Sequence, residues 1–251
     1  MHVVITGASS GIGAALAREF DAPGNGLTLV ARRQALLEEL ASGLRAKTHV
    51  VAADLSDSAR CGEWIAGAEA ALGPIDVLIN NAGSTMVRRF ADGDLEEPER
   101  MLRLDLINPL RLTHAVLPSM LQRRSGTIVE VCSVAAFAAL LGTTYYAAAK
   151  AGLAAASEVL RGELRGSGVT VVTVYPGPIR TAMSTQAFDS FADHWTKRLA
   201  REAAPEELAR RIRRAVERRQ ARVVFPAGYT VARHLPNLAR WVLDRLTPPI
   251  R

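Results

Sequence analysis

The chain of 251 residues is 49% hydrophobic and carries a formal net charge of +6. This length and apolar content fit one large α/β domain with a full core. No stretch reaches the roughly 18 apolar residues that a membrane-spanning helix needs, so we expect no membrane span. The arginines gather at residues 210–219, where they alternate with apolar residues. This pattern is typical of a solvated helix face and argues against nucleic-acid binding.

The histidines and cysteines exclude two further classes of protein. The five histidines have no metal-ligand spacing, which predicts that the protein holds no metal. The two cysteines, Cys61 and Cys132, lie far apart in apolar surroundings, as expected for reduced thiols of a cytoplasmic protein. The first strand begins within the opening residues, and we therefore expect no signal peptide.

The expected elements alternate between strands and helices along the chain. Short apolar runs predict strands at residues 3–5, 27–31, 49–53, 75–79, 127–131, 169–174 and 223–225. Apolar residues at helical spacing predict helices at 13–20, 34–44, 58–72 and 97–122. Asp57 or Ser56 would cap the third helix, Pro98 suits the first turn of the fourth, and Pro109 interrupts that helix.

This alternation indicates the fold class. Continuously apolar strands separated by amphipathic helices are typical of a parallel sheet that is covered on both faces. Right-handed crossovers then give a doubly wound, seven-stranded parallel sheet in a single α/β domain.

A glycine-rich turn at residues 6–13 (TGASSGIG) joins the first strand to the first helix. Gly7, Gly11 and Gly13 would let the backbone approach a ligand closely, and the helix N-terminus would offer free N–H groups to a pyrophosphate. A tight turn without a ligand is the alternative explanation. No Gly-Lys-Ser/Thr follows, so the turn is not a P-loop.

The end of the second strand indicates which dinucleotide binds. An acidic residue there usually holds the adenosine ribose, whereas an arginine accommodates a 2′-phosphate. This chain has Arg32 and Arg33 and no acidic residue at that place. The sequence therefore favours NADP(H) over NAD(H), with Arg32 as the better candidate for the phosphate.

Tyr146 and Lys150 stand four residues apart, which places them on the same face of a helix. A nearby ammonium favours the phenolate and lowers the pKa of a tyrosine. Tyr145 is the competing phenol, but it lacks this spacing. Ser133 follows the strand at 127–131, at the sheet edge where catalytic groups of open α/β sheets gather. Each residue alone could have a purely structural role.

These segments together resemble the short-chain dehydrogenase/reductase family, in its compact branch of about 250 residues. The resemblance rests on residues 6–13, Asp54, Asn80-Asn81-Ala82-Gly83, Ser133, Tyr146 to Lys150, and Pro176 to Thr181, in family order. It implies a Rossmann fold and an enzyme that reduces carbonyls or oxidises alcohols with a nicotinamide cofactor.

The resemblance also implies a role for each matching residue. Tyr146 would be the general acid or base, Lys150 would lower its pKa and bind the nicotinamide ribose, and Ser133 would orient the substrate oxygen. The residues expected to bind the cofactor are Gly7, Ser9, Ser10, Gly11, Ile12, Gly13, Arg32, Arg33, Asp54, Leu55, Asn81, Ala82, Gly83, Tyr146, Lys150, Pro176, Gly177, Ile179 and Thr181. Asp54 would meet the adenine ring, and residues 176–181 would wall the nicotinamide pocket.

One position departs from the family pattern. The family usually has an asparagine that completes a proton relay through water, and alignment puts Asp105 at that position. Asp105 is therefore a candidate catalytic residue whose negative charge could raise the pKa of Tyr146. Asn108, three residues later, is the alternative member of the relay.

The resemblance divides the chain into a core at 1–181, a substrate lid with helices at 182–222, and the last strand with a C-terminal helix at 223–251. The lid carries apolar and aromatic residues, namely Met183, Phe188, Phe191 and Trp195, together with His194. They indicate a bulky apolar carbonyl or alcohol substrate, unless they only pack the lid.

Two surfaces suggest partners. Residues 235–246 form an amphipathic pattern with nearby arginines, which favours docking on the chain's own body or on a sister subunit over weak contact with a membrane surface. The family commonly forms dimers or tetramers through two long helices, here 97–122 and the alanine-rich 146–165. A non-catalytic dinucleotide sensor on the same fold is the alternative function. A nucleotide-sugar epimerase is disfavoured by the glycine spacing.

Overall fold

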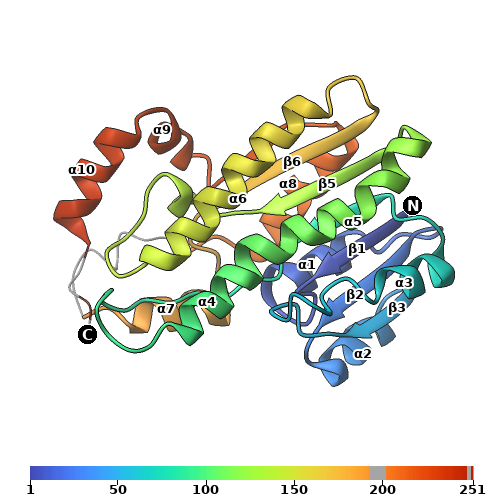
Figure 1. Cartoon of the computed structure of the whole chain (residues 1–251), viewed down its shortest axis with the longest axis horizontal. Coiled ribbons are helices and arrows are strands. Elements are labelled where there is room, and N and C mark those ends of the chain that lie inside the picture. The colour runs from blue at the N-terminus through green and yellow to red at the C-terminus, as the bar shows by residue number, and fades with distance from the viewer. Residues whose placement is uncertain (193–201, 248–249, 251) are drawn as a thin grey trace.

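The structure is a computed structural model that describes residues 1–192, 202–247 and 250. Its centre is one seven-stranded sheet, in the order β3-β2-β1-β4-β5-β6-β7, in which every neighbouring pair is parallel (Figure 1). The strands are β1 (His2–Thr6), β2 (Gly26–Ala31), β3 (Lys47–Ala52), β4 (Val77–Asn80), β5 (Gly126–Val131), β6 (Val169–Pro176) and β7 (Arg222–Phe225). The predicted doubly wound, single-domain α/β fold is confirmed.

Helices connect the strands and cover both faces of the sheet. They are α1 (Gly11–Glu19), α2 (Gln34–Ser42), α3 (Ile65–Leu72), α4 (Glu96–Leu102), α5 (Asn108–Arg123), α6 (Thr144–Glu163), α7 (Ala182–Asp189), α8 (Pro205–Glu217), α9 (Tyr229–His234) and α10 (Pro236–Leu246). No helix among the described residues is long and apolar enough to cross a membrane.

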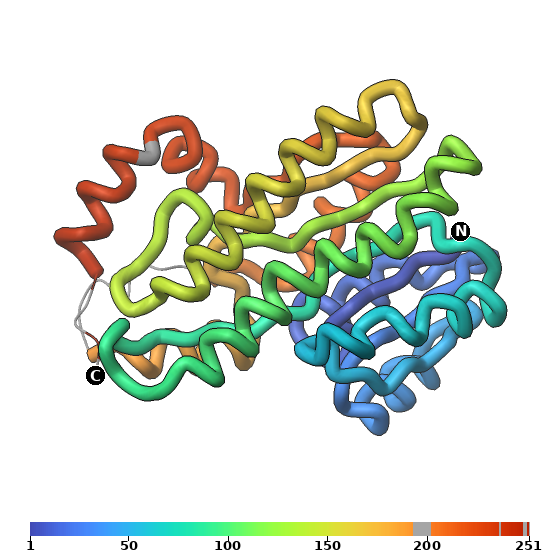
Figure 2. Tube along the Cα trace, viewed as in Figure 1, coloured from blue at the N-terminus to red at the C-terminus, as the bar shows by residue number. Residues whose placement is uncertain are grey.

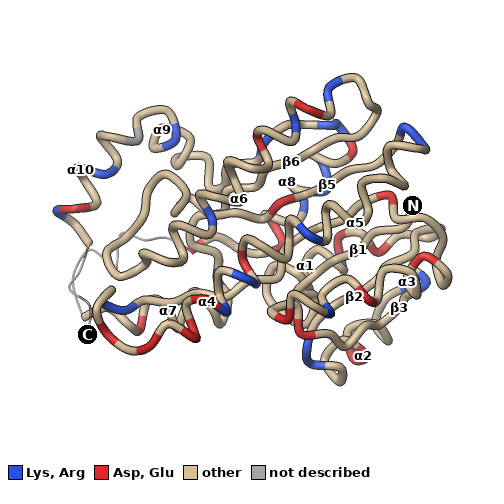
Figure 3. Tube along the Cα trace, viewed as in Figure 1, with Lys and Arg blue, Asp and Glu red and all other residues tan. Residues whose placement is uncertain are grey.

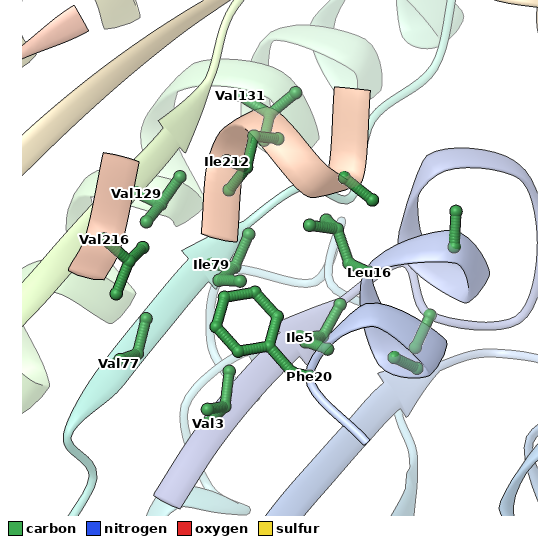
Figure 4. Close-up of a cluster of buried hydrophobic side chains, with 14 of the residues drawn as sticks. Val3, Ile5, Leu16, Phe20, Val77, Ile79, Val129, Val131, Ile212 and Val216 are labelled. Carbon is green, nitrogen blue, oxygen red and sulfur yellow. The ribbon is translucent and has the colours of Figure 1, made fainter. Parts of the chain in front are cut away.

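The two faces of the sheet bury alternate residues of the same strands. Val3 and Ile5 of β1 pack under Leu16 and Phe20 of α1 and Ile212 of α8 (Figure 4). The intervening residues of the sheet pack against α3 and α5 on the other face. This alternation follows from the period of two in a strand, and it explains why the strands are apolar throughout.

Two predicted helices differ from the structure. The helix predicted at 58–72 begins only at Ile65. Residues 57–65 form successive turns, in which Arg60 N donates to Asp57 O and Glu63 N donates to Arg60 O. These hydrogen bonds run between residues three apart, whereas α-helical bonds run between residues four apart. The apolar residues of the segment are therefore spaced as in a helix, but the backbone forms turns.

The helix predicted at 97–122 is interrupted before Pro109. Residues Arg103–Ile107 form a π-helical turn between α4 and α5, and Pro109 lies in the first turn of α5, where proline is tolerated. Asp105 therefore lies in the widened turn, which the sequence pattern did not reveal.

Candidate functional site

The glycine-rich turn forms a cradle between β1 and α1. Gly7 and Gly11 have positive φ values of 68° and 56°, which glycine adopts readily. A Cβ atom on Gly13 would lie 2.2 Å from the carbonyl oxygen of Gly7, so the turn and the helix can pack this closely only with glycine. The first N–H groups of α1 have no partner within the helix and can bind an anion.

The two arginines after β2 lie beside this cradle. The guanidinium of Arg33 donates to the hydroxyls of Ser9 and Ser10, at 2.9 and 2.8 Å. Arg32 is exposed and makes no hydrogen bond or ion pair with any described residue. Both arginines line the same cavity as the glycine turn. Arg33 therefore stands next to the phosphate turn, whereas the sequence favoured Arg32 for the phosphate.

A second group of polar side chains lies where β5 ends and α6 begins. Ser133 follows β5, and its hydroxyl accepts a hydrogen bond from the backbone N–H of Ala135. Lys150 of α6 is buried, and its Nζ lies 5.9 Å from the centre of the Tyr146 ring, one turn earlier. The same Nζ donates to the carbonyl oxygen of Val131 at 3.2 Å. These contacts hold the ammonium beside the phenol.

Asp105 completes this group through an ion pair with Lys150. Its Oδ1 lies 2.8 Å from Lys150 Nζ, and neither side chain is accessible to more than 5%. Its Oδ2 accepts hydrogen bonds from the N–H and the hydroxyl of Ser84, at 2.9 and 3.2 Å. A Cβ atom on Gly83 would lie 2.5 Å from Oδ1, so this glycine leaves room for the ion pair.

Burial and charge act on the titrating groups in opposite directions. Burial raises the pKa of the Tyr146 phenol, whereas Lys150 and a hydrogen bond with Ser133 lower it without cancelling the effect. Burial lowers the pKa of Lys150, but the charge of Asp105, its hydrogen bond to the ammonium and the nearby Tyr146 together outweigh burial, and the net pKa is raised. At neutral pH the site therefore holds a protonated phenol beside a charged ammonium.

Asn108 faces away from these groups. It is buried, its Oδ1 accepts from the Ser58 hydroxyl at 2.7 Å, and its Nδ2 donates to the carbonyl oxygen of Leu55 at 2.7 Å. These bonds fix the segment after β3. The geometry thus puts Asp105, rather than Asn108, next to Lys150.

Asp54 also has protein partners. Its carboxylate accepts from the N–H and hydroxyl of Ser56, and it forms an ion pair with Arg100 at 2.8 Å. Asp54 and Leu55 still line the cavity. Any contact of Asp54 with an adenine ring would therefore compete with these bonds.

One cavity of about 780 Å³ connects the cradle with the Ser133–Tyr146–Lys150 group. Except for Gly13, all the residues that the sequence predicts as catalytic or cofactor-binding line it. Gly13 instead packs under the turn. Among the lid residues, Met183, Phe188 and Phe191 line the cavity, while His194 and Trp195 lie outside the described residues.

Several residues that line this cavity were not predicted from the sequence. Ser84 holds Asp105, and its position directly after the Asn-Asn-Ala-Gly segment could have indicated it. Tyr229 and Leu243 come from α9 and α10, far along the chain from the catalytic segments. No local pattern marks them, because only the fold brings these helices to the cavity.

A buried polar group lies behind the site, between β4, β5 and α5. Glu130 Oε1 accepts from Asn80 Nδ2 at 3.0 Å and from the Thr113 hydroxyl at 2.8 Å. Burial raises the pKa of Glu130 to about 7, although these hydrogen bonds and Lys150 act against it. Glu130 Oε2 and Asn80 Oδ1 have no hydrogen-bond partner among the described residues.

Comparisons with known proteins agree with this geometry. A family model described as short chain dehydrogenase matches residues 1–192. The ketoacyl reductase HetN of Nostoc sp. is 31% identical over 226 residues, which cover 88% of this chain and 77% of the relative. The dehydrogenase/reductase SDR family member 7B of Bos taurus is 33% identical over 261 residues, which cover 97% of this chain and 79% of the relative.

Solved structures show the same fold. A short-chain dehydrogenase from Sphingobium yanoikuyae in complex with NADPH superposes with a TM-score of 0.82 at 33% identity, covering 97% of this chain and 95% of that one. A short-chain dehydrogenase from Streptomyces avermitilis has the same TM-score at 29% identity, covering 97% and 94%. The glycine turn, the Tyr–Lys pair and these matches agree, and the chain belongs to the short-chain dehydrogenase family of oxidoreductases.

Proposed function

We propose that the protein interconverts a carbonyl group and an alcohol on a fairly bulky apolar substrate, with NADP(H) as its cofactor. The observation that carries this proposal is the single cavity, which joins the glycine cradle and two arginines to Ser133, Tyr146 and Lys150. The solved neighbour whose complex holds NADPH supports the choice of cofactor.

The cradle fits a dinucleotide. A Cβ on Gly7 would approach the Cα of Ala82 to 2.8 Å, so glycine keeps open the space between the turn and the segment after β4. We propose that the N–H groups of α1 hold the pyrophosphate and that Arg32 and Arg33 hold the 2′-phosphate. We also propose that Lys150 and residues 176–181 hold the nicotinamide end, which supplies the hydride.

The protein's own residues supply the proton. During reduction, hydride adds to the carbonyl carbon, and the C=O π electron pair moves to the oxygen, which takes the phenolic proton of Tyr146. Ser133 would hold that oxygen, and the Lys150 ammonium would stabilise the phenolate left behind. The raised pKa of Tyr146 supports reduction, because it keeps the phenol protonated at neutral pH.

The apolar end of the cavity supports a bulky substrate. Met183, Phe188 and Phe191 line it from the lid, and Leu243 lines it from α10. Such walls favour a large apolar carbonyl compound over a small anion. We also propose a homodimer or homotetramer, and a cytoplasmic protein, in which the free, buried Cys61 and Cys132 stay reduced.

The first experiment would follow loss of reduced-nicotinamide absorbance with NADPH and with NADH. The substrates would be aldehydes, aryl ketones, 3-oxoacyl thioesters and steroid ketones, with Tyr146→Phe as the control variant. We expect turnover with NADPH that is lost in the variant. Tight NADPH binding without turnover on any substrate would instead favour a dinucleotide sensor, and a preference for NADH would contradict the proposed role of the arginines.

A further inference from the structure

Four large apolar side chains of the C-terminal helices are exposed. They are Val231, Leu235, Leu238 and Trp241, with 61%, 52%, 54% and 55% of their surfaces accessible, and we call them the apolar stripe. Leu235, which directly precedes α10, and Leu238 and Trp241 of α10 recur every three residues, so they follow one side of the helix. The described residues leave these four side chains exposed, so this side of the helices does not pack on the described part of the chain.

The helices that carry the stripe are attached to the body from their other side. The guanidinium of Arg233 reaches Glu158 of α6 at 3.5 Å and lies 5.3 Å from the centre of the Tyr175 ring of β6. Tyr229 and Leu243 point into the cavity of the candidate site. In Figures 1 and 2, α9 and α10 stand at one end of the molecule, beyond the sheet. The stripe is therefore held outward.

The charges beside the stripe are mainly positive. Residues 229–246 contain three arginines and one aspartate (Figure 3). The guanidinium of Arg245 lies 4.0 Å from the centre of the Trp241 ring, and Arg240 is exposed. Tryptophan and arginine with apolar neighbours are typical of helices that lie in the interface of an anionic membrane.

We propose that α9 and α10 dock the protein on membrane surfaces that contain anionic phospholipid. The apolar stripe would enter the boundary between headgroups and acyl chains, and Arg240 and Arg245 would meet the lipid phosphates. Because the inner side of the same helices lines the cavity, docking would bring the cavity next to the acyl chains. A second copy of the chain bound to the stripe would instead place protein between the cavity and the acyl chains. The docking itself does not depend on the proposed reaction.

The test is co-sedimentation of the full chain with vesicles, without substrate. Vesicles of phosphatidylcholine would be compared with an equimolar mixture of phosphatidylcholine and phosphatidylglycerol, at low and high salt. We expect binding to the mixed vesicles that weakens with salt. We also expect a blue shift of tryptophan emission that is absent in Trp241→Phe, since the indole would enter an apolar environment.

Three variants test the stripe and its charges. Leu238→Ser with Trp241→Ser should lower vesicle partitioning at least about tenfold, because each large apolar side chain adds more than one factor of ten when buried. Arg240→Glu should weaken binding to the mixed vesicles only. Leu36→Ser is the matched control, since Leu36 is an exposed leucine of α2 at the other end of the molecule. Thermal melting and NADPH binding would verify that each variant folds.

Two results would overturn the proposal. One is that the wild-type protein does not bind the mixed vesicles at low salt, or that the double variant Leu238→Ser with Trp241→Ser binds them as well as the wild type does. The other is that the protein self-associates through the stripe. Sedimentation velocity would then show a smaller particle for the double variant than for the wild type, and vesicles would bind neither protein. The stripe would then be an interface between copies of this chain.

Discussion

Lys150 Nζ and Asp105 Oδ1 form a buried ion pair of 2.8 Å, and the same Nζ lies 5.9 Å from the centre of the Tyr146 ring. The family relay usually places a neutral amide where this chain has a carboxylate. The carboxylate fixes the ammonium and neutralises part of its charge, while its own charge raises the pKa of Tyr146. This arrangement favours a phenol that stays protonated and acts as an acid.

Asp105→Asn should shift the pH dependence of alcohol oxidation to lower pH. Oxidation needs the phenolate of Tyr146 as a base, and its rate rises as that group loses its proton. Removing the carboxylate removes a charge that raises the pKa of Tyr146, so the rising limb of the pH–rate profile should move down. We expect activity to survive.

The control is Asp76→Asn, which removes a carboxylate that is paired with Arg123 and does not line the cavity. The measurement is kcat for oxidation between neutral and strongly basic pH. A profile of Asp105→Asn that overlays the wild type, with unchanged rates, would remove Asp105 from the mechanism.

The two arginines after β2 should discriminate between the cofactors. Arg33→Ala and Arg32→Ala should each weaken NADPH binding by about ten- to a hundredfold, as expected for a lost charge-assisted bond to phosphate. Binding of NADH, which lacks the 2′-phosphate, should change little in Arg32→Ala and should weaken less than binding of NADPH in Arg33→Ala. Fluorescence titration of both cofactors measures this difference.

The geometry ranks the two variants. Arg33 already bonds Ser9 and Ser10, so its loss should also loosen the phosphate turn, whereas Arg32 has no described partner to lose. Equal losses for NADPH and NADH in Arg32→Ala would show that this arginine does not read the 2′-phosphate. Arg60→Ala, an exposed arginine outside the cavity, is the control.

The sequence predicted the parts of the site that local chemistry determines. The glycine turn must pack against α1 within a few residues, and the spacing of Tyr146 and Lys150 follows from one helical turn, so both are visible in the chain itself. The seven strands were likewise found, because buried parallel strands are apolar on both faces.

Long-range packing determines the rest. The π-helical turn directs Asp105 toward Lys150, while Asn108 forms a hydrogen bond with Ser58. Neither orientation follows from regular helical spacing. Tyr229 and Leu243 reach the cavity only because β7 carries the last helices back over the site. Partners that come from distant segments leave no periodic signal.

The outer face of α6 should hold a subunit interface. Val159 is 62% exposed there, on the same side as the exposed Ala148 and Ala155, and small residues allow a partner helix to approach closely. Val159→Asp would bury a charge in that contact and should lower the sedimentation coefficient toward that of a monomer. Leu36→Asp on α2 should leave it unchanged. Equal values for wild type and Val159→Asp would place the interface elsewhere.

Glu130 should make the protein less stable as the pH rises. Its pKa is raised from 4.5 to about 7 in the folded state, so the folded chain binds its proton more tightly than the unfolded chain does. The stabilisation is fully present below pH 4.5 and is lost as the pH rises to about 7.

Glu130→Gln should remove this dependence, because an amide cannot ionise and keeps an oxygen that can accept from Asn80 and Thr113. The difference in free energy of unfolding between the variant and the wild type should therefore shift by up to about 3 kcal/mol in favour of the variant as the pH rises from acidic to mildly basic. Urea unfolding at a series of pH values measures this, with the exposed Glu63→Gln as control. If the free energies of unfolding of wild type and Glu130→Gln change with pH in parallel, Glu130 is ionised in the folded protein and its carboxylate is stabilised by Lys150.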